Sequence, residues 1–282
     1  FGHEYIQTLE PRLLYVNTPF RDQSDMPLFD SAAKDLSFNT LFDPNPFSGV
    51  DRVADGHTVT AGAYTRFIDP ANGAEALRLG LAQRYLLRDQ RITPEGVPQE
   101  QRFSDIFLLG STNLIPKWWL GGTVQYSPEH DRTMRSTAGV RYFPGPFRTV
   151  SMNYTYTRGS SEQLDPGYQW PIYGPAKTPG QPASSSQSPN GCFGTLYGVG
   201  RLNYSLREQR VTDSLLGFEY DSGCWIGRLV ALRRSTGLSE ETTRLMFQIE
   251  FVGLSRLGSN PLSALKDNIP GYQLLREDPI RP

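Results

Sequence analysis

The stretch "RLMFQIEF" at residues 244–251 alternates between two kinds of side chain and decides the fold. One set of alternate residues is apolar: Leu245, Phe247, Ile249 and Phe251. The other set is mostly polar: Arg244, Met246, Gln248 and Glu250. Because successive side chains of a strand point to opposite faces of a sheet, the stretch predicts a strand with one apolar face and one wet face.

The same alternation recurs along the whole chain, with turn residues between the segments. Twelve strands are predicted, at roughly 9–20, 57–68, 75–88, 103–115, 118–127, 133–143, 147–158, 163–173, 195–206, 212–221, 225–235 and 242–254. Helical periodicity occurs only weakly, in "NPLSALKDN" at residues 260–268. The pattern therefore predicts an all-β protein built on one antiparallel sheet.

The length of these strands favours a membrane protein. They run for about ten residues, as a tilted strand needs in order to cross a bilayer, whereas soluble strands more often have about five or six. A soluble sandwich remains the alternative, because it shows the same alternation with its apolar face turned inward. The preferred interpretation is an antiparallel transmembrane β-barrel.

The composition agrees with this interpretation. The 282 residues include 27 Gly, 22 Pro, 15 Phe and 14 Tyr, and the net charge is −1. No window approaches the roughly 18 consecutive apolar residues of a membrane-spanning helix, but barrel strands escape such windows because they alternate. The mixed charges form no basic stripe for nucleic acid.

The chain starts at Phe1 without a signal peptide, so we expect it to be a piece of a longer protein.

The connections between the predicted strands fall into a long and a short set. Outer-membrane barrels have short periplasmic turns and longer external loops. On this basis residues 21–56 form a long external loop, and residues 222–224 form a periplasmic turn. The Pro/Ser-rich insertion at 174–194 falls on the periplasmic side. Several aromatic residues at strand ends fit an interfacial girdle, although ordinary packing accounts for any single one equally well: Trp118, Trp119, Tyr142, Phe143, Trp170, Tyr173, Tyr220 and Trp225.

No catalytic or metal-binding arrangement stands out, so neither an enzyme nor a cofactor is predicted. The three histidines, His3, His57 and His130, have no metal-ligand partner at a useful spacing. The chain contains neither a G-x-S-x-G elbow nor a full glycine fingerprint. Four acidic residues of the first loop offer oxygen ligands for a cation, but a solvated acidic loop is favoured: Asp22, Asp25, Asp30 and Asp35.

Five stretches, in order along the chain, resemble the C-terminal part of the LPS-assembly protein family, LptD. They are "EPRLLYVNTPFRDQSDMPLFD", "FSGVDRVADGHTVTAGAYTRF", "YQWPI", "DSLLGFEYDSGCW" and "FVGLSRLGSNPLSALKDNIPGYQ". The resemblance covers essentially the whole chain. It implies a very large barrel in the outer membrane of a Gram-negative bacterium, behind a periplasmic jellyroll, with the lipoprotein LptE as a plug in the lumen.

In this family, lipopolysaccharide arrives over a periplasmic LptA bridge and leaves through a lateral gate between the first and last strands. The resemblance implies that residues 1–254 supply about the last twelve strands, and that 255–282 form a periplasmic C-terminal tail. The loop 21–56 folds over the lumen. Residues 242–254 form one lip of the gate, through Leu245, Phe247, Ile249 and Phe251. A diffusion porin, another outer-membrane barrel or a secreted all-β adhesin are the alternatives.

Four polar residues are candidates for contact with the polar part of lipopolysaccharide along the lumen, namely Arg244, Gln248, Glu250 and Arg228. The favoured interpretation is that these residues only fill the barrel interior.

The two cysteines suggest a disulfide on the periplasmic side. In familiar members of the family the turn 222–224 carries two adjacent cysteines that bridge to the periplasmic domain, whereas here it reads Gly223–Cys224. A hairpin of 195–206 and 212–221 brings position 192 opposite 224. With strands about 4.8 Å apart and disulfide Cα atoms about 5.5–6 Å apart, a Cys192–Cys224 bridge is expected. One alternative is a bridge from Cys224 to the missing periplasmic domain, with Cys192 paired elsewhere or free. The other alternative is two free thiols.

Overall fold

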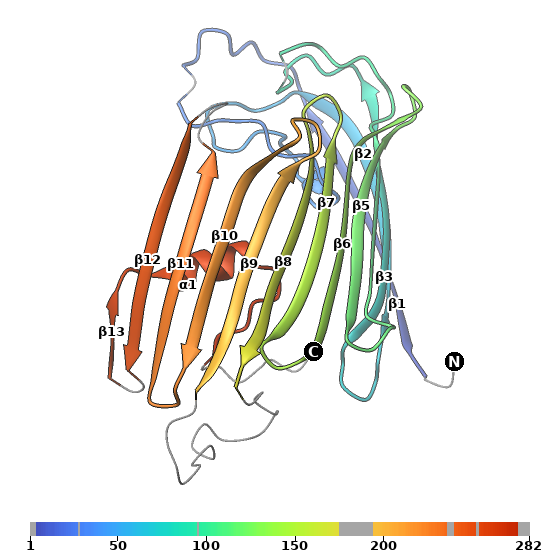
Figure 1. The fold of residues 1–282 in the computed structure, drawn as a ribbon. Coiled ribbons are helices and arrows are strands. Elements are labelled where there is room, and N and C mark those ends of the chain that lie inside the picture. The colour runs from blue at the N-terminus through green and yellow to red at the C-terminus, as the bar shows by residue number, and fades with distance from the viewer. Residues whose placement is uncertain are drawn as a thin grey trace. The chain divides into compact units, whose positions relative to one another are not determined.

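The computed structural model describes residues 4–27, 29–94, 96–174, 194–235, 240–251 and 254–275. Within these ranges thirteen antiparallel strands form a single sheet, in which the spatial order of the strands follows the sequence (Figure 1). The predicted all-β, antiparallel fold is confirmed. No helix in these ranges is long and apolar enough to span a membrane.

The strands agree closely with the predicted alternation. They are β1 (Ile6–Thr18), β2 (Gly56–Ile68), β3 (Glu75–Arg88), β4 (Ile106–Thr112), β5 (Trp118–Ser127), β6 (Arg132–Gly145), β7 (Arg148–Thr157), β8 (Ser161–Tyr173), β9 (Thr195–Ser205), β10 (Arg210–Asp221), β11 (Trp225–Ser235), β12 (Glu241–Phe251) and β13 (Ser255–Gly258). The short β13 was not predicted, because four residues are too few for a period of two to be read. The α-helix α1 (Pro261–Asn268) coincides with the only weak helical pattern.

The chain divides into two compact units, which are described separately. The first comprises residues 1–112 and 121–137, and it contains β1 to β4. Its strands β1 and β2 pair without interruption from Ile6↔Ile68 to Thr18↔Gly56. On one face, the inner face, residues 38–42 pack against the sheet through an apolar cluster: Phe38, Leu41, Tyr64, Ala82 and Phe107.

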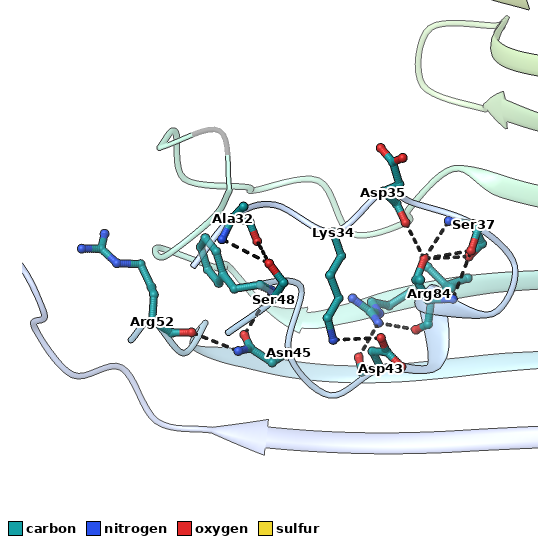
Figure 2. A network of polar contacts seen from close by, with 12 residues as sticks. Ala32, Lys34, Asp35, Ser37, Asp43, Asn45, Ser48, Arg52 and Arg84 are labelled. Carbon is teal, nitrogen blue, oxygen red and sulfur yellow. Dashed lines mark hydrogen bonds and ion pairs between the residues drawn. The ribbon is translucent and has the colours of Figure 1, made fainter. Parts of the chain in front are cut away.

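The long loop between β1 and β2 is held by polar contacts (Figure 2). The guanidinium of Arg84, on β3, donates to the backbone oxygens of Leu41 and Asp43. Lys34 Nζ lies 2.9 Å from the Asp43 carboxylate, and the Asn45 side chain donates to the Arg52 oxygen at 3.0 Å. The contacts to the Leu41, Asp43 and Arg52 oxygens pair backbone carbonyl groups of the folded loop. The loop therefore has a defined structure over its described residues.

Two carboxylates of this loop order its backbone. Asp51 accepts from the backbone N–H groups of Asp30 at 2.7 Å and of Phe29 at 2.9 Å. These two hydrogen bonds hold the pKa of the Asp51 carboxyl below its ordinary value, because they stabilise the charged form. Asp22 accepts from the backbone N–H and the hydroxyl of Ser24, which lower its pKa in the same way.

The second unit comprises residues 113–120 and 138–282, and it contains β7 to β13 with α1. Figure 1 shows α1 lying across β10 to β12 on one face of this unit, which we call its inner face. The helix packs there against a row of cross-strand neighbours, the apolar row: Val199, Gly217, Val230 and Met246. Leu265 and Ile269 cover this row, and both are almost fully buried. The contact accounts for the presence of Met246 among the polar residues of its strand.

The other face of the second unit exposes large apolar side chains to the surroundings. Exposed fractions are 59% for Leu216, 54% for Phe218 and 45% for Leu229. On the inner face, by contrast, Glu219, Arg228 and Gln248 are no more than 3% exposed. A soluble sandwich buries its apolar face, whereas here that face is open across several strands. This distribution is typical of a sheet that meets lipid with its outer face.

We predict that Leu265→Ala lowers the free energy of unfolding by about 2–5 kcal/mol, because it leaves a cavity between α1 and the apolar row. Denaturant unfolding of the protein in detergent micelles measures the effect. The matched control is Leu257→Ala on β13, where the leucine is 60% exposed and the loss is expected to be about 0.5 kcal/mol or less. Equal losses at both positions would contradict the docking of α1.

Candidate functional site: the inner face of the last strands

A charged row of cross-strand neighbours lies beside the apolar row: Tyr197, Glu219, Arg228 and Gln248. The register places Arg228 of β11 directly between Glu219 of β10 and Gln248 of β12. Arg228 Nε donates to Glu219 Oε1 at 2.9 Å, and Nη1 donates to Gln248 Oε1 at 3.1 Å. One guanidinium therefore ties three neighbouring strands together.

Glu250 extends the charged row toward the end of the sheet. Its carboxylate accepts from Arg228 Nη1 at 2.6 Å and lies 3.3 Å from Arg256 Nε on β13. Two guanidiniums thus face two carboxylates, which balances the local charge. Because removing ions from water is costly unless they are paired and hydrogen-bonded, this balance is what allows the row to be buried.

The segment after α1 is tied to the same face. The Tyr272 hydroxyl donates to Glu219 Oε1 at 2.7 Å. Burial, and then the nearby Glu219 carboxylate, raise the pKa of Tyr272 above its ordinary value, so the hydroxyl keeps its proton and its donor role. Farther along, Gln273 exchanges hydrogen bonds with Gln169 of β8 at 2.8 and 2.9 Å and accepts from the Phe147 N–H at 2.7 Å. This docking against the inner face was not predicted.

The strand β12 has two differently paired sides. On one side it pairs with β11 along its full length, from Trp225↔Phe251 to Ser235↔Glu241. On the other side β13 pairs only with Gln248 to Phe251, and Ser259 adds hydrogen bonds to the Phe247 backbone. No strand in the described part of the chain pairs with residues 241–246 on that side. Half of this edge of β12 is therefore covered and half is open.

The predicted gate and lumen residues fall on the expected faces of β12. Leu245, Phe247 and Phe251 are exposed on the outer face and Ile249 is half-buried there, whereas Gln248 is buried on the inner face. Arg244 is exposed and takes no part in the charged row. Three predicted lumen residues do meet there: Arg228, Gln248 and Glu250.

Sequence reasoning missed Glu219, the buried partner of this cluster. Its signal is present, since Glu219 alternates with Phe218 and Tyr220 and therefore falls on the wet face of β10. Only the register across the turn 222–224 pairs it with Arg228. Without that register the two residues look like independent charges.

The turn 222–224 depends on its glycine. Gly223 has a φ of +94°, a backbone conformation that residues with a Cβ rarely adopt. A cysteine at this position would be strained, and the chain has a single cysteine there, the exposed Cys224. Cys192 lies outside the described residues, so its pairing with Cys224 stays a prediction.

The other candidates do not gather into a site. His57 lies 3.0 Å from the Tyr15 hydroxyl and His130 lies 3.2 Å from the Ser127 hydroxyl, while His3 falls outside the described ranges. In the described part of the chain no three acidic, histidine or cysteine side chains come together in a way that could hold a metal ion. Among the four acidic candidates of the first loop, Asp22 instead accepts hydrogen bonds from the backbone N–H and the hydroxyl of Ser24.

These features together define the class of protein. A sheet of long antiparallel strands with an exposed apolar outer face and a buried polar inner face is the architecture of a segment of a transmembrane β-barrel. Residues 1–177 match the family model for LPS transport system D, LptD, and the chain belongs to this family.

Three relatives illustrate the similarity. The chain is 50% identical over 284 residues to the LPS-assembly protein LptD of Albidiferax ferrireducens, covering 100% of this chain and 35% of the relative. It is 47% identical to the protein of the same name from Paracidovorax citrulli, covering 100% and 34%. It is 40% identical to that of Ralstonia nicotianae, covering 100% and 33%. The chain thus spans about a third of the length of these relatives.

We predict that Arg228→Met lowers the free energy of unfolding by about 3–5 kcal/mol, because it leaves Glu219 buried and charged without its partner. Denaturant unfolding in detergent micelles measures the loss. The matched control is Arg233→Met, which breaks the exposed pair with Glu241 and is expected to cost at most about 1 kcal/mol. The double variant Arg228→Met/Glu219→Gln should recover part of the loss, and a single variant as stable as the control would disprove the role of the charged row.

We predict that Cys192 and Cys224 form a local disulfide, which stabilises the hairpin by about 3–4 kcal/mol in the chain-entropy model. Mass mapping of the full-length protein under non-reducing conditions should yield one peptide that contains both cysteines. A peptide that joins Cys224 to a segment upstream of residue 1 would instead establish a bridge to another domain.

Proposed function

We propose that this chain is part of an outer-membrane translocon that inserts lipopolysaccharide into the outer leaflet of a Gram-negative bacterium. The observation that carries the proposal is the half-open edge of β12, which lies between an apolar outer face and a polar inner face, in a chain of the LptD family. The proposed activity is transport without covalent chemistry.

The physical argument concerns the cost of opening a sheet in lipid. Unpaired backbone N–H and C=O groups cost several kcal/mol each in hydrocarbon, so a lateral exit has to be confined to a short seam. The β13 hairpin already pairs with Gln248 to Phe251. We propose that residues 241–246 form the separable part of the seam, and that they pair with the first strand of the barrel in the longer protein.

The side chains of the seam suit an amphipathic cargo. Leu245 and Phe247 face outward and are 69% and 52% exposed, which suits acyl chains that enter the bilayer. Arg244 is exposed on the inner face, next to the open half of the edge. We therefore rank Arg244 as the first contact for the sugar–phosphate part. Gln248, Glu250 and Arg228 already satisfy one another, and their proposed role is to hold the lip in place.

The proposed partners follow from the family. They are the lipoprotein LptE as the plug of the lumen and the periplasmic LptA bridge, which would deliver lipopolysaccharide through a domain outside this chain. A free diffusion porin is the less favoured alternative. The packing of α1 and residues 269–275 against the apolar row and the charged row argues against an open aqueous channel along this part of the sheet.

Photo-crosslinking in cells tests the proposal, with a crosslinking amino acid placed at Arg244 or at Leu245 of the full-length protein. The two positions are adjacent in sequence and face opposite sides of β12. We expect Arg244 to capture lipopolysaccharide during active transport, and we expect this signal to fall when the supply from inside the cell is cut off.

Leu245 serves as the matched control, since its side chain meets the membrane whether or not transport occurs. Its capture should persist after the supply is cut off, because the surrounding leaflet still contains lipopolysaccharide. Equal and supply-independent capture at both positions would contradict the gate. Absence of capture at Arg244 would favour the porin.

A further inference from the structure

The inner face of the first unit carries an arginine row, which the register of three strand pairs defines: Thr8, Arg66, Arg78 and Ser111. Arg66 of β2 and Arg78 of β3 stand directly opposite each other. Like charges in directly opposed positions destabilise a sheet. The two outer members of the row are neutral, so the row itself contains no compensating anion.

One carboxylate forms an ion pair with an arginine of this row. Glu10 of β1 forms an ion pair with Arg66 through Nη2. In the described part of the chain Arg78 has no carboxylate partner. Its Nε, like that of Arg66, is buried and has no hydrogen-bond partner there. A buried N–H donor of a guanidinium that lacks an acceptor is costly.

Two guanidiniums of this region lie over one aromatic ring, that of Tyr64. Tyr64 lies on β2 next to Arg66 on the same face, and it is 5% exposed. The guanidinium carbons of Arg12 and Arg78 lie 4.7 and 4.9 Å from the centre of its ring. Cation–π contacts of this kind orient guanidiniums without neutralising them. Arg12, Arg66 and Arg78 therefore form a group of three cations with one carboxylate, and we call it the arginine cluster.

Three other inner-face arginines are paired within the chain. Arg84, farther along β3 on the same face as Arg78, donates to three loop and strand oxygens. Arg201 lies 2.8 Å from Asp165, and Arg228 is held by two glutamates. Among the described residues, buried Nε donors without a partner also occur at Arg132 and Arg141. What distinguishes the arginine cluster is therefore the direct opposition of Arg66 and Arg78 with a single carboxylate nearby, which leaves a net positive charge for an anion from outside to offset.

We propose that the arginine cluster binds a phosphate group of the transported lipid. Guanidinium forks match the geometry of phosphate oxygens, and charge-assisted hydrogen bonds to phosphate are among the strongest in proteins. A phosphate between Arg66 and Arg78 would offset their mutual repulsion. The inference rests on the proposed function, since that function brings a phosphorylated lipid to the inner face.

Binding of two forms of one lipid to the full-length protein tests the inference. The probes are lipid A with its phosphates and the same lipid A after enzymatic removal of the phosphates, and the protein is purified in detergent with its partners. We expect the wild type to bind the phosphorylated form at least about tenfold more tightly. The ratio of the two affinities, phosphorylated over dephosphorylated lipid A, should fall by about tenfold in the variant Arg78→Gln, as expected for the loss of one charge-assisted hydrogen bond. The affinity for the dephosphorylated lipid A should stay unchanged.

The matched control is Arg102→Gln, which removes one cation of the same unit from an exposed pair with Asp89 at 3.3 Å. It should keep the wild-type ratio. Arg78→Lys retains the charge and should keep most of the ratio if charge rather than fork geometry dominates. The heat-dependent shift in gel mobility that folded barrels show in dodecyl sulfate checks the folding of each variant, and Arg12→Gln replaces any variant that fails to fold.

A third arm adds inorganic phosphate as a competitor, which distinguishes a site for free phosphate from one that requires the lipid. Competition in the wild type but not in Arg78→Gln supports recognition of the phosphate group itself. Preserved discrimination without competition supports recognition of the lipid-linked group. Equal wild-type binding of both lipids, or an unchanged ratio in Arg78→Gln, would overturn the inference and leave the proposed function standing. Failure of the wild type to bind either lipid would overturn both.

Discussion

The structure depends on the requirement that every backbone polar group of a sheet in lipid finds a partner within the sheet. Twelve strands of seven to fourteen residues meet this requirement by pairing in sequence order, and their outer face can then consist largely of leucine and phenylalanine. The polar and charged side chains of the strands are consequently directed mostly to the inner face. Bulk water does not reach all of these side chains. They therefore form cross-strand rows, whose members hydrogen-bond or ion-pair with one another or with the segments that cover them.

The two units cover their inner faces by different means. In the first, the long loop between β1 and β2 returns to the sheet, and Arg84 holds its backbone. In the second, α1 covers the apolar row and Tyr272 completes the charged row. Both solutions place a segment without long strands against a wet face. Both also leave defined gaps, at the edge of β12 and at the arginine cluster, where the proposed cargo meets the protein.

Most of the strands could be predicted, because a two-residue period sustained over about ten residues fits a strand and not a helix. Residues 75–88, 118–127 and 225–235 were predicted with their observed ends. The packing of α1 could not be read in the same way. Its signal was the presence of Val199, Val230 and Met246 on wet faces, and these residues form one row only after the register of three strand pairs is known. The pairing of Arg228 with Glu219 and the opposition of Arg66 and Arg78 were hidden for the same reason. Alternation is a local property, whereas register depends on turns and bulges.

The contacts of Gln273 determine when, during synthesis, the middle strands gain their last hydrogen bonds. Its partners Gln169 and Phe147 precede it by 104 and 126 residues. Synthesis runs from the N-terminus, so β7 and β8 are complete long before the residue that satisfies their inner face exists. The middle strands therefore reach their final environment only after the last described segment of the chain has left the ribosome and docked. A chain that ends before residue 273 contains the residues of all thirteen described strands but lacks the partner of Gln169. Unfinished and finished chains therefore differ in an unpaired amide on the inner face.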